Sequence, residues 1–331
     1  MFKSASDYIR KPIYVKDIAY DQFQLWLILL CRAISGCIYC KSIYRKGIPL
    51  DQFVNLPEDV QHIILSKLPL KEAVQTSILS SKWRSLWTLY PKLRFDGTVM
   101  FGKKMNGKQR EQYARQFIDT VNAVLQQCQG KVVEELVIKF GFDNLLMDHL
   151  NNWVRFAAAS HTKFLSFVLT PRDLEALGNP QYIFPFQLLE NRSIFSLQLH
   201  FVSVMLPTQF CGFPKLRKLD LREVKFNSLL GFFYADGANI RRFEHRHKHL
   251  KVVCVTGFKA SNGQIEFLVH IVENAPALEV LTVDQSDKLV KNEPLLVKKK
   301  VGKYMDGAVY ADVRRYIEGT VSSKCCLRLL F

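Results

Sequence analysis

A repeated apolar pattern constrains the fold of this 331-residue chain more than any other feature of its sequence. Apolar residues recur at positions i, i+3 and i+5, and the last two share one face of a β-strand because side chains alternate along a strand. A strand and its return segment cannot bury that face alone, so successive units must stack. The six triplets are Val133/Leu136/Ile138, Phe164/Phe167/Leu169, Ile194/Leu197/Leu199, Leu216/Leu219/Leu221, Leu250/Val253/Val255 and Leu278/Leu281/Val283.

Apolar stripes at helical spacing lie between some of these strands. Their alternation with short strands predicts an α/β solenoid with parallel strands and helical return segments over residues 96–331, closed by a C-terminal cap. The stripes are Tyr113, Phe117, Val121, Val124 and Cys128, then Leu146, Leu150, Trp153, Val154 and Ala157, and finally Ile265, Leu268, Val269 and Val272.

Residues 53–95 form a separate pattern of three short helices. Pro57 suits the first position of a helix, where no backbone donor is needed. Pro69 ends that helix, and Pro91 ends the third one. So small a unit cannot bury all of its aliphatic and aromatic surface, so the remainder should bind the rest of the chain or another protein. The third helix carries a stripe at i, i+3, i+4 and i+7, namely Trp83, Leu86, Trp87 and Tyr90.

This segment resembles the F-box of plant F-box/leucine-rich-repeat proteins. It departs from the family at Ser81, where such proteins often carry a basic residue. The match is ordered and free of gaps. The matching residues are Leu56-Pro57, Val60, Ile64-Leu65, Leu68-Pro69, Val74, Ser77, Leu79-Ser80, Lys82-Trp83-Arg84 and Leu86-Trp87.

The resemblance implies a substrate-recognition subunit of an SCF (Skp–cullin–F-box) ubiquitin ligase. The F-box would dock on the Skp adaptor, and through it on a cullin, while the repeats bind a target protein for ubiquitination. Such a subunit is a non-catalytic adaptor without a cofactor. The alternative is a non-ligase scaffold or binding protein with a vestigial F-box. The adaptor-binding residues, carried over by position, are Leu56, Pro57, Val60, Ile64, Leu65, Leu68, Leu79 and Trp83.

The resemblance also extends through the repeats. Segments 213–221 and 265–279 are similar to recognisable repeats of the family, and the likeness covers roughly residues 53–283. The asparagine that often follows the strand is missing, and residues 222–249 stand where the family has room for more repeats, so we expect an irregular solenoid. The domains are then 1–50, an extension of unknown structure, 51–95, the F-box, and 96–331, the solenoid.

The formal charge of +16 is unevenly distributed. Residues 1–50 carry +5, residues 51–100 carry +1 and residues 101–331 carry +10. Basic clusters at Arg241–Lys251 and Lys288–Lys303 leave three readings open: a solvated face, a surface for an acidic docking motif or nucleic acid, or a nuclear localisation patch. We expect the solvated face, and we do not expect nucleic acid as a partner because no stacking aromatics accompany the lysines.

The N-terminal extension argues against a membrane partner. Its apolar run, 25–40, would span about 24 Å as a helix, short of the ~30 Å hydrocarbon core, and Arg32 interrupts it. A helix packed on the body of the protein, or an accessory tail, fits better. The eight cysteines are scattered among apolar residues, a pattern typical of reduced thiols in an intracellular protein, so we expect the nucleus or the cytoplasm.

No motif points to an enzyme, a metal or a cofactor. The chain lacks the phosphate-binding, dinucleotide-binding, serine-hydrolase and zinc-protease motifs. Cys37 and Cys40 have metal-ligand spacing, but no second pair follows. His245, His247 and His249 would share one side of a strand, but their basic neighbours oppose a cation.

Overall fold

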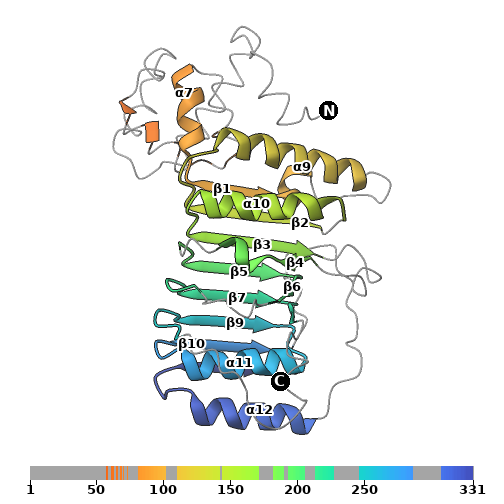
Figure 1. Ribbon diagram of the computed structural model, residues 1–331, viewed down its shortest axis with the longest axis vertical. Coiled ribbons are helices and arrows are strands. Elements are labelled where there is room, and N and C mark those ends of the chain that lie inside the picture. Colours follow the sequence, from red (N-terminus) through yellow and green to blue (C-terminus); the bar gives the residue numbers. More distant parts are fainter. Residues whose placement is uncertain are drawn as a thin grey trace, which may run out of the picture. The chain divides into compact units, whose positions relative to one another are not determined.

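The computed structural model divides into two compact units, residues 1–94 with 115–135, and residues 95–114 with 136–331 (Figure 1). We describe each unit by itself. The structure describes eight separate positions between 57 and 73 (57, 58, 61, 62, 65, 68, 70 and 73), and then residues 81–101, 110–141, 144–170, 182–189, 193–205, 213–226, 246–285 and 307–330.

The first unit is helical where the F-box-like pattern lies. Gln61 donates its backbone N–H to the carbonyl of Pro57 at 3.0 Å, as expected for a helix that begins at Pro57. The predicted third helix comprises the helix α7 (Ser81–Leu86) and a 3-10 turn, η3 (Trp87–Leu89). The whole stripe from Trp83 to Tyr90 is buried, with exposed fractions of 0–6%. This stripe is therefore the core-facing side of the third helix.

The hydroxyl of Tyr90 ties the end of this stripe to the earlier helices. It donates a hydrogen bond of 2.5 Å to the backbone carbonyl of Leu68. Burial raises the pKa of Tyr90, so the hydroxyl keeps its proton and remains a donor. The long helix α9 (Arg110–Gln127) follows in the chain, and its predicted stripe is buried at Phe117, Val121 and Val124.

The second unit contains a sheet of eight strands in the order β1-β2-β3-β5-β7-β9-β10-β11 (Figure 1). Every pairing from β3 to β11 is parallel, which confirms the predicted α/β fold with a parallel sheet. Only residues 95–96 of β1 belong to this unit. The strands are β1 (Lys92–Asp96), β2 (Glu135–Gly141), β3 (Phe164–Thr170), β5 (Ser196–His200), β7 (Lys218–Arg222), β9 (Val252–Thr256), β10 (Val280–Asp284) and β11 (Cys326–Leu330).

The strand register confirms four of the six triplets and corrects one, while the first triplet, Val133/Leu136/Ile138, is confirmed by its burial. Leu165 pairs with Leu197, so the true triplet of β3 is Thr162/Leu165/Phe167 and not Phe164/Phe167/Leu169. Phe164 is 43% exposed, whereas the Thr162 side chain is fully buried. The apolar pattern alone placed this triplet two residues too late in the chain, because a threonine occupies the first position of the repeat.

Two strands of the sheet lie outside the six predicted triplets. In β11, Leu327 pairs with Leu281, so the first position of the triplet falls on Lys324 and breaks the apolar pattern. In β1, Leu93 and Phe95 are buried, but the strand overlaps the segment assigned to the F-box. Each of the two strands lies at one end of the sheet order.

The repeats lack the asparagine that often follows the strand, and residues in the left-handed backbone conformation form the turns instead. Phe201 (φ 56°), Glu223 (φ 49°) and Gly257 (φ 70°) each directly follow a strand. The N–H of Phe201 donates to the carbonyl of Arg222 at 2.9 Å, so the turn also links neighbouring repeats. Beyond these turns, β4 (Ile183–Phe184), β6 (Ser203–Val204) and β8 (Lys225–Phe226) form a second, small parallel sheet.

The remaining described helices are α8 (Gly97–Phe101), α10 (Met147–Ala159), α11 (Asn262–Asn274) and α12 (Gly307–Thr320), with the 3-10 turns η5 (Asn144–Leu146) and η7 (Phe186–Leu189). The predicted stripe over 146–157, from η5 into α10, is fully buried. In α11 the predicted stripe is buried at Leu268, but Ile265, Val269 and Val272 are only half-buried, and the other buried residues are Gln264 and Ile271. The Gln264 amide tolerates burial because its oxygen accepts the N–H of Lys259 at 2.8 Å and its nitrogen donates to nearby carbonyls.

Candidate functional site

The structure places four of the eight predicted adaptor-binding residues. Leu56, Val60, Ile64 and Leu79 lie outside the described residues. Pro57 is exposed, whereas Leu65 and Leu68 are 2% exposed and Trp83 is fully buried. In this conformation Pro57 is open to a partner, whereas the side chains of Leu65, Leu68 and Trp83 are buried. That the eight residues contact an adaptor stays a prediction.

A row of polar side chains crosses three strands on the other side of the sheet from the core leucines. Ser166, Gln198 and Asp220 are paired in register on β3, β5 and β7. The Ser166 hydroxyl donates to Gln198 Oε1 at 2.8 Å, and Gln198 Nε2 donates to Asp220 Oδ2 at 3.4 Å. Arg222 closes the row with two bonds of 2.9 Å to the Asp220 carboxylate. The row satisfies its own polar groups and holds the strands in register.

His200 is a titratable group buried beside this row. It lies between Val168 and Arg222 in the register and is only 3% exposed. Burial, aided by the charge of Arg222, lowers its pKa from 6.5 to about 4, so its imidazole is neutral at pH 7. None of the described residues forms a hydrogen bond with its Nδ1.

We expect His200 to make the protein less stable in acid. Because its folded pKa lies below its unfolded value, the unfolded state binds more protons between about pH 4 and 6.5, and the free energy of unfolding falls as the pH drops through that window. From about pH 7 to pH 5, His200 should account for a loss of about 2 kcal/mol. His200→Gln should remove this part of the pH dependence in urea unfolding, whereas His249→Gln, at an exposed position, should not. Equal pH dependence in His200→Gln and wild type would contradict this assignment.

The described cysteines are free, and Cys128, Cys254 and Cys325 hold their protons. Burial raises the pKa of Cys128 to about 11, and burial also raises the pKa of Cys254 and of Cys325. A nucleophilic or redox-active cysteine needs a lowered pKa. These thiols therefore have the properties of packing groups.

The described part of the histidine cluster lies in a turn and not on a strand. His247 and His249 belong to the turn before β9, and His245 lies outside the described residues. His247 Nε2 is 3.1 Å from Nε2 of His270 on α11. The described part of the chain holds no group of three or more His, Cys, Asp or Glu residues that could bind a metal ion. Cys37 and Cys40, with the whole of 1–50, lie outside the described residues.

None of the described helices is both long enough and apolar enough to cross a membrane. The apolar run 25–40 lies outside the described residues.

Sequence reasoning missed the polar row and His200. The signal was present in the residues that alternate with the triplets, since Gln198, Asp220 and Arg222 follow Leu197, Leu219 and Leu221 in the strands. Their meeting depends on the register, which joins residues 22 and 32 positions apart in the chain.

Two protein-family models match the chain. The F-box domain matches residues 53–95, and the domain described as "At1g61320/AtMIF1, LRR domain" matches residues 231–330. The predicted resemblance to F-box/leucine-rich-repeat proteins is thereby confirmed. No solved structure gives a significant match.

Three relatives from Arabidopsis thaliana illustrate the similarity. A putative FBD-associated F-box protein is 31% identical over 52% of this chain and 40% of its own length. An F-box/LRR-repeat protein is 28% identical over 77% of this chain and 83% of its own length. A putative F-box/FBD/LRR-repeat protein is 28% identical over 78% of this chain and 58% of its own length. The chain thus spans less than two thirds of two of these three relatives.

Proposed function

We propose that this chain, which carries an F-box and a leucine-rich-repeat domain, is the substrate-recognition subunit of an SCF-type ubiquitin ligase. The F-box would dock on a Skp adaptor, and through it on a cullin, while the repeats bind a target protein. The observation that carries this proposal is the presence of both modules, at 53–95 and at 231–330, on one chain.

The mechanism needs no catalytic residue on this chain. Holding the target near the ubiquitin-charged enzyme raises its effective concentration there, so that a bimolecular transfer becomes nearly intramolecular. The parallel sheet supports this role because each repeat adds exposed or half-buried side chains beside those of its neighbour, such as Lys218 next to Val252. We also propose the nucleus or cytoplasm as the place of action, which the free thiols support.

Co-expression with a Skp adaptor tests the docking half of the proposal. We expect a one-to-one complex in size-exclusion chromatography with mass detection. The double variant Leu56→Ala with Pro57→Ala should lose the complex, and Pro57, being exposed, can be replaced without opening the core. Trp83→Ala is unsuitable as the main variant, since removing a fully buried indole would unfold the helices around it.

Val99→Ala is the matched control, because Val99 is 79% exposed and lies outside residues 53–95. This variant should keep the complex. A folded wild-type chain that forms no complex would refute the ligase role and favour a scaffold with a vestigial F-box.

A further inference from the structure

The edge of the large sheet at which the strands begin is strongly basic. The first residue of β7 and the described segments just before β3, β5, β7, β9 and β10 contain seven lysines and arginines, all exposed, and one carboxylate, Glu279. We call this surface the basic edge. Its cationic residues are Lys163, Lys215, Arg217, Lys218, Arg246, Lys248 and Lys251.

Backbone hydrogen bonds bring these distant residues side by side. The N–H groups of Lys251 and Val252 donate to the carbonyl of Arg217, at 2.9 and 3.0 Å. Arg217 and Lys218 donate in the same way to Phe195, and Phe195 donates to Lys163 at 2.8 Å. Neighbouring strands are about 4.8 Å apart, so the edge from β3 to β10 is roughly 20 Å long.

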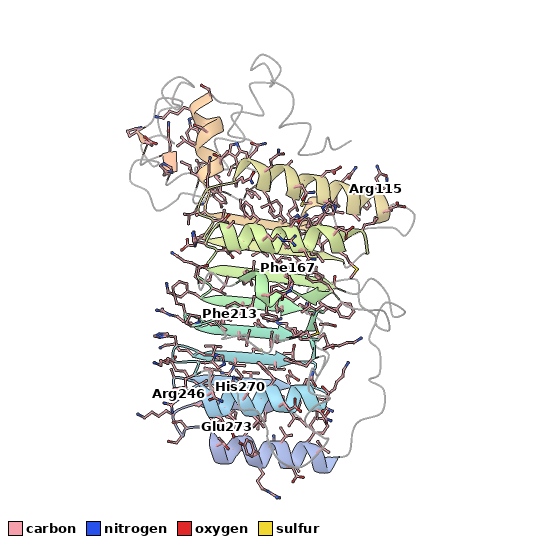
Figure 2. The ribbon with its side chains drawn as sticks, in the orientation of Figure 1. Arg115, Phe167, Phe213, Arg246, His270 and Glu273 are labelled. Carbon is pink, nitrogen blue, oxygen red and sulfur yellow. The ribbon has the colours of Figure 1, made fainter. Side chains whose placement is uncertain are left out.

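The basic edge is held in place by its own contacts. The guanidinium carbon of Arg217 lies 5.3 Å from the centre of the Phe195 ring, a cation–π contact. The turn that carries Arg246 and Lys248 is anchored to α11, because His247 donates its N–H to the carbonyl of Asn274 at 2.8 Å. Figure 2 shows Arg246 at this border of the sheet, near the end of α11. The cations therefore lie on an ordered frame.

Most of this positive charge is not neutralised. Lys251 pairs with Glu279 at 2.5 Å, but no carboxylate among the described residues pairs with Lys215, Lys218, Arg246 or Lys248. At the opposite edge, where the strands end, Glu223 pairs with Lys259 at 3.8 Å. A surface strip whose charge is mainly positive attracts anions.

We propose that the basic edge binds an extended acidic segment of the target protein. This inference rests on the proposed function, because the F-box makes a protein the ligand to be delivered. About six residues of extended chain span roughly 20 Å, and their alternation can direct about three carboxylates toward the edge along that length. A nucleic acid fits less well, since binding without sequence preference relies on stacking of successive bases on aromatic rings. Here Arg217 covers the face of Phe195, and Phe164, 43% exposed at the start of β3, is a single ring that cannot stack successive bases.

Fluorescence anisotropy on the full chain tests this surface. The probes are a labelled peptide of about twelve alternating Glu and Ser residues and a single-stranded uridine oligonucleotide of equal charge. We expect the peptide to bind more tightly than the oligonucleotide, and its affinity to fall with added salt. Reversing three exposed charges, in Lys215→Glu, Lys218→Glu and Lys248→Glu, should weaken peptide binding by roughly tenfold or more, since each exposed ion pair contributes a small share.

The matched control reverses three exposed charges elsewhere, in Arg155→Glu, Lys225→Glu and Arg315→Glu, so that the change in net charge is the same. It should bind the peptide within about twofold of wild type. Equal loss in both triple variants, or tighter binding of the oligonucleotide than of the peptide, would overturn the proposal. Adaptor binding, measured on the same samples, separates the two ideas, because loss of peptide binding alone leaves the ligase role standing.

Discussion

Phe167→Ala is expected to lower the free energy of unfolding by about 3–5 kcal/mol, the usual cost of deleting a buried phenylalanine ring. Phe167 is fully buried on β3 (Figure 2) and makes an edge-to-face contact with Phe184, with 5.7 Å between ring centres. Its removal leaves a cavity against two sheets, since Phe184 belongs to the small sheet. Urea unfolding followed by circular dichroism measures the effect.

Phe164→Ala is the control for this prediction. Phe164 lies three residues earlier on the same strand but is 43% exposed, so its loss should cost less than about 1 kcal/mol. The pair tests the register of β3 directly. If Phe164→Ala cost as much as Phe167→Ala, both rings would be buried, as the triplet Phe164/Phe167/Leu169 suggested.

Gly97→Ala is expected to destabilise the protein by about 1–3 kcal/mol, because it overfills a packed site. A Cβ at Gly97 would overlap Cδ2 of Phe140 and lie 2.8 Å from its Cε2. The Phe140 ring has little room to move, since it is 4% exposed and meets Phe101 edge-to-face at 6.5 Å between centres. Thermal unfolding of the wild type and of Gly97→Ala measures this difference in stability.

Gly319→Ala is the same chemical change at an open position. No atom lies within 4 Å of the added Cβ, and Gly319 belongs to α12. Alanine favours helix over glycine, so the free energy of unfolding should stay unchanged or rise by up to about 1 kcal/mol. A similar loss in Gly97→Ala and Gly319→Ala would show that crowding at Phe140 is not the cause.

Much of the fold could be read from local sequence patterns. Five of the six triplets occupy the predicted strand positions, and the stripe from Trp83 to Tyr90 is buried as expected. The failures share one physical cause. Thr162 and Gln264 are polar residues that the fold buries, and a reading of apolar periodicity does not count them.

The candidate sites depended more on tertiary structure. The polar row from Ser166 to Arg222 required the register of three strands. The pKa of His200 depends on burial and on Arg222, which lies 22 residues away and is its register partner on the next strand. Neither relation leaves a local signature that a single sequence could show.

Local sequence patterns specify the two modules. The F-box pattern and the apolar triplets are periodicities within short segments, and such periodicities fix the secondary structure and the buried face of each segment. The pairing of the strands sets which phenylalanine ring of β3 enters the core. It also places the cations at 163, 217 and 251 along one edge of the sheet. The reason is that hydrogen bonds between strands set those neighbours, and such bonds join residues that the chain keeps far apart.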